Sequence, residues 1–196
     1  MLAMIRIRLQ EKGFTLIELM VTLTIAAVLA LVATPGLTAY KRNAELTSTI
    51  NTLLSAINTA RSEAMKRGMK AMVLPANLSQ WSSGWTIFVD KDGDQVYSEA
   101  NDITVLTQGP PPSYFSISGT GSASGATPYI LYDGSGYSRL KNGGFGALTL
   151  SLSRNDLSGG ALYEQTRRLV IAKTGRVRTC KPASATDTTC AANSTQ

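Results

Sequence analysis

The chain has 196 residues, 43% of them hydrophobic, with 19 basic and 13 acidic side chains, a formal net charge of +6, two cysteines and no histidine. Without histidine it lacks the commonest general base and the commonest metal ligand, and no serine sits in a nucleophile-elbow pattern. The composition therefore disfavours an enzyme and predicts no cofactor, with only a Ser–Lys arrangement left open.

A long apolar run extends from Phe14 to about Ala39 and contains one charge, Glu18, near its start. As a helix it would be roughly 39 Å long, enough to cross a hydrocarbon core of about 30 Å. Its length, and the lack of a small-residue cleavage site beyond it, disfavour an ordinary secretory signal. We therefore predict a single-pass transmembrane helix at 14–39. Its N-terminal side is expected in the cytoplasm because basic residues precede the run, at Arg6, Arg8 and Lys12.

Glu18 is the unusual residue of this run. A carboxylate within a membrane helix costs several kcal/mol and points to a functional partner. The helical neighbours of Glu18 are apolar or threonine, so we expect a cation from outside the chain to pair with it. An ordinary anchor with an incidental glutamate is the alternative.

The sequence KGFTLIEL, from Lys12 to Leu19, resembles the signal of type IV pilins and type II secretion pseudopilins. The resemblance rests on a basic leader ending in Gly13, an aromatic Phe14 and an acid five residues into the mature chain. It implies that prepilin peptidase cleaves between Gly13 and Phe14, removing residues 1–13, and that Phe14 is N-methylated. It also implies that Glu18 pairs with the amino terminus of a neighbouring pilin during assembly. The protein would lie in the bacterial inner membrane before assembly, and in a pilus in the periplasm or at the cell surface afterwards.

Helical periodicity resumes after Pro35-Gly36, where proline is expected to kink the helix because it removes a backbone donor. Apolar residues then recur at steps of three and four, which predicts an amphipathic helix over about 41–67 that ends near Gly68. Its apolar face is expected to pack on the exported domain. The stripe consists of Leu46, Ile50, Leu53, Leu54, Ile57, Ala60 and Ala64.

Beyond Lys70 the pattern changes to short β-like runs separated by Gly, Pro, Ser and Asp. The expected strands are Ala71–Leu74, Trp85–Val89, Ile103–Leu106, Tyr114–Ser118, Tyr129–Tyr132, Ala147–Ser153 and Arg167–Ala172. Periodicity indicates only a β-rich domain. The pilin resemblance implies the rest of the α+β fold: a long N-terminal helix packed on a C-terminal antiparallel β-sandwich or sheet domain at 40–196.

The segment from Asp90 to Asp94 allows two interpretations. Its alternate carboxylates match the first half of an EF-hand loop, but the glycine comes two places early and no bidentate glutamate follows. An Asp-Gly turn before the next strand explains the same residues, so we favour a turn and predict no metal site. The flanking Trp81 and Trp85, with Phe88-Val89-Asp90, resemble the FimT/GspH branch of the pilin-like families, and both tryptophans are expected in the core.

Cys180 and Cys190 both lie in the part expected to be exported. An even cysteine count in an exported chain favours a disulfide, which would close a small C-terminal loop and contribute roughly 2–3 kcal/mol. Two free thiols are the alternative. Zinc is disfavoured because two cysteines without histidine are too few ligands.

Basic residues concentrate at 167–181, which holds six of them and no acid. Leu169–Ala172 suits a strand, Thr174-Gly175 a turn and Arg176–Cys180 a returning strand. Arg176 and Arg178 would then leave the same face, about 6.6 Å apart along the chain, with Lys173 across the turn. Such a patch can engage successive phosphates of a nucleic acid.

The GRVR sequence from Gly175 to Arg178, preceded by Lys173, resembles the C-terminal motif of FimT minor pilins, whose basic residues bind DNA in natural transformation. The resemblance implies sequence-independent DNA binding by Lys173, Arg176 and Arg178, with support from Gly175. Electrostatic support is expected from Arg167, Arg168 and Lys181. Two alternatives remain: a basic hairpin that only protects a sheet edge, and a structural minor pilin or GspH-like pseudopilin that primes pilus assembly or type II secretion without binding DNA.

Overall fold

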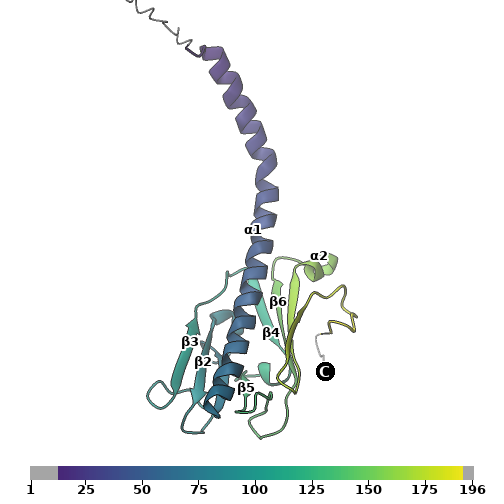
Figure 1. Cartoon of the computed structure of the whole chain (residues 1–196). Helices are drawn as coiled ribbons and strands as arrows, with labels where there is room; N and C mark the ends of the chain where they lie inside the picture. Colours follow the sequence, from purple (N-terminus) through teal and green to yellow (C-terminus); the bar gives the residue numbers. More distant parts are fainter. Residues whose placement is uncertain (1–12, 192–196) are drawn as a thin grey trace, which may run out of the picture. The chain divides into compact units, whose positions relative to one another are not determined.

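The computed structural model describes residues 13–191, apart from the side chains of residues 32–35. Residues 1–12 of the expected leader lie outside this description. The chain divides into two compact units, Met1–Arg42 and Asn43–Gln196. Helix α1 (Leu16–Arg67) contributes its first part to one unit and its later part to the other (Figure 1).

The first unit consists of the apolar part of α1. Its large apolar side chains between Phe14 and Leu31 are 49–80% exposed in the described structure, so this part of the helix presents a mainly apolar surface. Within residues 13–191 no single helix has the length and composition of a membrane span, whereas Leu16–Leu31 and Gly36–Arg67 have them together as a bent pair. The break between these segments contains the position of Pro35, where the sequence predicts a kink.

The second unit contains two four-stranded antiparallel sheets. The first sheet has the order β3-β2-β1-β5, with β1 (Lys70–Pro75), β2 (Trp85–Asp90), β3 (Ile103–Gln108) and β5 (Ile130–Tyr132). The second has the order β4-β6-β7-β8, with β4 (Phe115–Gly119), β6 (Leu148–Arg154), β7 (Thr166–Ile171) and β8 (Val177–Cys180). Three short helices connect strands: η1 (Trp81–Ser83), η2 (Gly121–Ala123) and α2 (Gly159–Glu164). The expected strands are all present, displaced by at most two residues at their ends, and the α+β class is confirmed.

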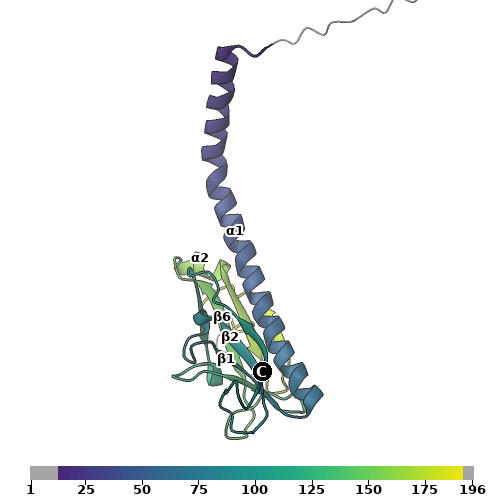
Figure 2. The same ribbon diagram turned by 90° about the vertical axis from the view of Figure 1, so that its left-hand side faces the viewer.

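The core of this unit forms where the later part of α1 meets the inner faces of both sheets (Figures 1 and 2). The helix contributes a fully or almost fully buried stripe: Leu46, Ile50, Leu53, Ala56, Ile57, Ala60 and Ala64. Leu54, expected in the stripe, is only partly buried, and Ala56 lies in it instead.

Both tryptophans are core residues, as the sequence predicts. Trp81 and Trp85 are 2% and 1% exposed. The indole nitrogen of Trp81 donates to the carbonyl of Ala123 at 2.9 Å, which satisfies a polar group that burial would otherwise leave unpaired. Trp81 therefore joins η1 to η2 across the core.

The expected Asp-Gly turn lies at the start of a longer connection between β2 and β3, which is formed by residues 91–102. Carboxylates stabilise this loop: Asp90 accepts from the backbone of Gly93, and Asp102 accepts from the backbones of Lys91 and Ser98. Gly93 still turns the chain locally at a φ of 85°. These side-chain bonds let the connection run longer than a two-residue hairpin.

Candidate nucleic-acid interface

The hairpin of β7 and β8 separates apolar from basic side chains. Val170 lies opposite Arg178, and Ile171 lies opposite Val177. Because side chains alternate along a strand, Leu169, Ile171 and Val177 pack on the core while Val170 and Arg178 lie on the outer face. Arg176, which directly precedes β8, occupies the next alternate position before Arg178.

A shallow cavity of about 270 Å³ lies on this outer face. It is lined by Val170, Ala172, Lys173, Thr174, Arg176 and Arg178. Lys173 and Arg176 are exposed, and Arg178 is half-buried. The structure therefore brings the three basic motif residues together around one concave surface with a small apolar floor.

The turn that carries Lys173 is closed by two backbone hydrogen bonds. Gly175 N–H donates to Ala172 O at 2.8 Å, and Ala172 N–H donates to Arg176 O at 3.0 Å. Gly175 is buried at a φ of 80°, and a Cβ there would overlap the carbonyl oxygen of Gly136. Gly175 therefore serves the turn by its conformation and close packing, and its N–H is already engaged within the hairpin.

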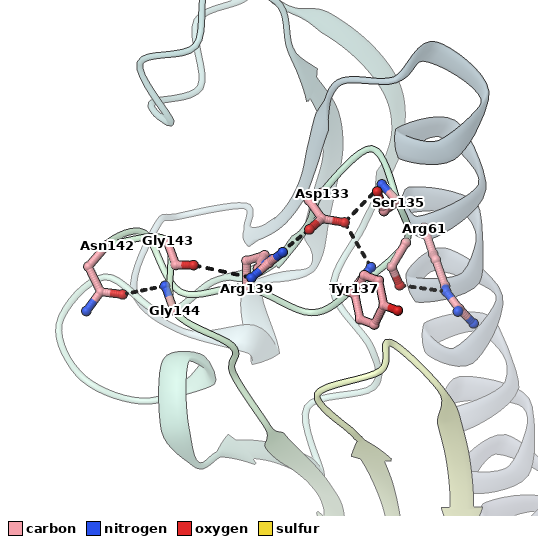
Figure 3. Close-up of polar contacts among 9 residues, drawn as sticks. Arg61, Asp133, Ser135, Tyr137, Arg139, Asn142, Gly143 and Gly144 are labelled. Atoms are coloured by element: carbon pink, nitrogen blue, oxygen red, sulfur yellow. Dashed lines mark hydrogen bonds and ion pairs between the residues drawn. The ribbon is translucent and has the colours of Figure 1, made fainter.

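Arg61 of α1 and the loop at 133–138 support this turn from the inside. Arg61 donates from Nε to Gly136 O at 3.0 Å and from Nη2 to Thr174 O at 3.3 Å. Ser138 N–H donates to Lys173 O at 3.2 Å. Figure 3 shows the Arg61 contact beside the loop that carries Asp133 and Tyr137. The backbone of the turn is thus bonded to a helix and to a second loop.

Asp133 organises that second loop. Its Oδ1 accepts from Ser135 N–H and Tyr137 N–H, both at 3.0 Å, and its Oδ2 accepts from Arg139 Nε at 2.6 Å (Figure 3). Burial alone raises the pKa of Asp133, but the hydrogen bonds from Arg139 and the two backbone N–H groups outweigh it, so the pKa is lowered. The carboxylate therefore remains charged at neutral pH and keeps the loop in shape behind the turn.

The other three basic residues of the segment do not line this cavity in the described part of the chain. Arg168 is only 8% exposed and donates from Nη1 to Cys190 O. Arg167 donates to the carbonyls of Glu164 and Thr166. Lys181 forms an ion pair with Glu164, and that hydrogen bond lowers the pKa of Glu164. Arg168 is thus a structural residue, and the other two make local contacts near α2.

The expected disulfide between Cys180 and Cys190 is present, with Cα atoms 5.8 Å apart. Arg178 donates from Nη2 to Thr189 O at 3.1 Å, so one cavity residue also holds the loop that the disulfide closes. Asp187 accepts from the backbones of Ala183, Thr189 and Cys190. These hydrogen bonds hold the pKa of Asp187 well below its usual range, and the one from Ala183 has the largest effect.

At the N-terminal end, the structure gives Glu18 a partner that the sequence interpretation missed. Glu18 N–H donates to Thr15 Oγ1 at 3.3 Å, and Thr15 Oγ1 donates to Glu18 Oε2 at 3.5 Å. Thr15 thus caps the start of α1 through its hydroxyl, which is the first half of a capping box, while the Glu18 carboxylate accepts from that hydroxyl and not from the Thr15 backbone. The Thr-x-x-Glu spacing is the sequence signal that predicts it. The negative charge of Glu18 also lies where the helix dipole favours an anion.

A long N-terminal helix whose later part packs on a two-sheet antiparallel domain defines the class of pilin-like proteins. Residues 8–34 match the family model described as Prokaryotic N-terminal methylation motif. Residues 49–175 match the model described as Type II transport protein GspH. Because that match covers more than half of the chain, the protein belongs to the GspH family.

A solved structure with a TM-score above 0.5 shows the same fold at low sequence identity. Type IV minor pilin FimU from Pseudomonas aeruginosa PAO1, in a P21 crystal form, has a TM-score of 0.53 at 17% identity, covering 74% of this chain and 98% of its own. A P65 crystal form of the same pilin has a TM-score of 0.46 at 16% identity, covering 74% and 97%. No curated protein sequence matches this chain.

The packing around Gly175 predicts that a methyl group added there lowers stability more than one added at another glycine of positive φ. Gly175→Ala should lower the free energy of unfolding by about 2–4 kcal/mol, because it adds overlap with Gly136 O to the cost of positive φ. Gly143→Ala is the matched control, since Gly143 has a φ of 87° and no atom near its Cβ position. We expect a loss of about 1 kcal/mol for the control. Chemical denaturation of the full chain measures both, and equal losses would contradict the packing argument.

The lowered pKa of Asp187 predicts an acid-sensitive C-terminal loop. A carboxyl whose folded pKa lies below its unfolded value of about 3.9 stabilises the fold above that pH, and the contribution is lost as pH falls below about 4. Amide exchange should show Thr189 and Cys190 protected at pH 7 and exposed in acid, while amides of β6 stay protected. Asp187→Ala should remove the protection at pH 7, and retained protection in that variant would refute the assignment.

Proposed function

We propose that this protein is a minor type IV pilin that binds extracellular DNA without sequence specificity, for DNA uptake in natural transformation. The observation that carries the proposal is the cavity lined by Lys173, Arg176 and Arg178 on the outer face of β7–β8. These are the residues at which the GRVR segment resembles the DNA-binding motif of FimT minor pilins. The resemblance and the geometry thus select the same three side chains.

The lining of the cavity suits a phosphate backbone. Three of its residues are cationic, and no carboxylate is among the lining residues that the structure describes. Each arginine has a planar fork of donors that matches phosphate oxygens, while Lys173 supplies a compact charge from the turn. Arg178 uses one donor on Thr189 O, which fixes the direction of its guanidinium and leaves other N–H groups for a ligand.

The shape of the surface argues for sequence-independent recognition. The cavity is formed by a hairpin and its turn. No helix carries its cations, whereas a helix is a common reader of bases in the major groove. Phosphate contacts position a protein on DNA without reading its bases. Binding should therefore depend strongly on salt and weakly on sequence.

The N-terminal segment supplies the second part of the proposal. We infer that prepilin peptidase cleaves between Gly13 and Phe14, that Phe14 is then N-methylated, and that 14–39 spans the inner membrane before assembly. The methylation-motif match at 8–34 supports this processing. Glu18, oriented by its bond with Thr15, then pairs with the amino terminus of a neighbouring pilin in the filament.

A structural role is the second candidate, because the family match carries the description of a type II transport protein. In that role the protein is a minor pilin or pseudopilin that primes a filament and contacts only protein. The basic hairpin then serves as a charged edge that discourages strand-to-strand association. The two candidates differ in whether the protein binds DNA at all, either as a monomer or in a filament.

DNA binding by the purified full chain in neutral detergent micelles tests the favoured function. Lys173→Gln and Arg176→Gln should each weaken binding roughly tenfold to duplexes of unrelated sequence, because each removes a charged hydrogen-bond donor. Each should also reduce the slope of log affinity against log salt by about 0.9. The measurement is a fluorescence anisotropy titration over a range of salt concentrations.

Lys181→Gln is the control for this experiment. It removes the same charge from a residue near the far end of β8 that pairs with Glu164. We expect its affinity for DNA to stay within about twofold of the parent, since it loses no phosphate contact. Undiminished binding in a Lys173→Gln/Arg176→Gln double variant would reject the site. Failure of the parent chain to bind at low salt, both alone and in filaments, would favour the structural role.

Glu18→Ala tests the assembly role. The change removes the charge that pairs between subunits, so incorporation into filaments should fall at least tenfold. Incorporation is measured by immunoblotting of sheared filaments against the membrane fraction. Thr15→Ala is the control, because it removes the capping hydroxyl and keeps the carboxylate. Normal incorporation of Glu18→Ala would contradict the pairing, and equal loss in Thr15→Ala would assign the effect to helix capping.

A further inference from the structure

A second polar cluster lies at the end of β2 and the start of β3, where the loop of residues 91–102 leaves and re-enters the first sheet. Val89 pairs with Ile103, so Asp90 and Asp102 flank the neck of this loop on neighbouring strands. Asp92 follows two residues after Asp90. The fold therefore brings together two carboxylates from the start of the loop and one from its end.

These three carboxylates converge closely. One oxygen atom from each of Asp90, Asp92 and Asp102 lies within 4.8 Å of the other two. Asp92 is exposed and Asp102 half-buried, whereas Asp90 is only 3% exposed. The cluster is thus open to solvent on one side and closed by Asp90 on the other.

Asp90 has an oxygen that the protein leaves unsatisfied. Its Oδ1 accepts from Gly93 N–H at 2.9 Å. Its Oδ2 is buried and has no hydrogen-bond partner among the described residues. A buried, unpaired carboxylate oxygen is costly, and two more carboxylates nearby increase that cost by repulsion. Within residues 13–191, the ion pairs that the structure describes include none to these three acids.

Backbone donors hold the other carboxylates in place. Asp102 accepts from Lys91 N–H at 3.1 Å and from Ser98 N–H at 2.8 Å, and Asp92 accepts from Asp94 N–H at 3.3 Å. These bonds orient both side chains without neutralising their charge. The cluster is therefore positioned in advance for a cation.

We propose that Asp90, Asp92 and Asp102 form a calcium site at the neck of the β2–β3 loop. Calcium binds oxygen ligands at about 2.3–2.6 Å, so two ligands of one ion lie at most about 5.2 Å apart, and the three carboxylate oxygens lie within that limit. Magnesium usually keeps several waters and is held by one or two carboxylates, so three converging carboxylates suit calcium better. Water completes the coordination on the exposed side. The site joins both ends of the loop through one ion.

The alternate acids at 90–94 resemble the first half of an EF-hand loop, but the early glycine and the missing glutamate disfavour that motif. The proposed site uses a different set of ligands from the EF-hand set. Asp102 lies beyond the position where an EF-hand places its last ligand, and strand pairing brings it to the cluster. Asp94, which the EF-hand pattern includes, is not part of the cluster.

Calcium titration of the purified full chain in detergent micelles tests the proposal. Isothermal titration should detect one site with a dissociation constant of about 0.1–1 mM, the range of extracellular calcium modules. The thermal unfolding midpoint should rise over the same concentrations, because the ion binds the folded state. No binding, no rise in the midpoint, or an equal rise with magnesium would overturn the proposal.

Two variants locate the site. Asp92→Asn keeps an acceptor for Asp94 N–H but removes one charge, and it should weaken calcium binding at least tenfold. Its midpoint without calcium should equal or exceed that of the parent, which separates lost binding from misfolding. Glu99→Gln removes the same charge from an exposed position of the same loop and should stay within about twofold. Unchanged affinity in Asp92→Asn, or equal weakening in both variants, would refute the assignment.

Discussion

Burial of the α1 stripe between Leu46 and Ala64 is the interaction on which the second unit depends. The stripe and the inner-face residues of both sheets form one buried apolar cluster, so the helix closes the core where the two sheets meet. The same stretch of helix presents Arg61 at its edge, and Arg61 bonds to Gly136 and Thr174. Packing of the helix thereby sets the position of the β7–β8 turn.

Strand alternation converts this packing into a charged outer surface. Leu169, Ile171 and Val177 pack on the core, so the alternate residues of the same two strands must face outwards. A register shift of one residue would bury Arg178 and expose Val177. The basic surface is therefore as strongly specified as the core, although its residues make few contacts of their own.

Much of this arrangement was predictable from local sequence patterns. The strands follow from short β-like runs such as Leu148–Ser153, and the convergence of Arg176 and Arg178 follows from their spacing of two. The contacts of Arg61, Arg168 and Asp102 do not follow from local patterns, because their partners lie far away in the chain, at Gly136, Cys190 and Asp90. For Arg168 the sequence predicts only electrostatic support, and not its bond to Cys190. The cap that Thr15 forms with Glu18 is present in the sequence as a Thr-x-x-Glu pattern, so this contact is predictable from local spacing.

The hydrogen bond between Arg178 and Thr189 links the basic surface of Lys173, Arg176 and Arg178 to the oxidation state of the two cysteines. Thr189 belongs to the small loop closed by Cys180 and Cys190, and such bridges persist in oxidising compartments and not in the reducing cytosol. A newly made chain with reduced thiols lacks this covalent closure, so Thr189 has more freedom to leave Arg178. Oxidation of the two thiols is thus a maturation step that restricts the guanidinium of Arg178 on the basic surface.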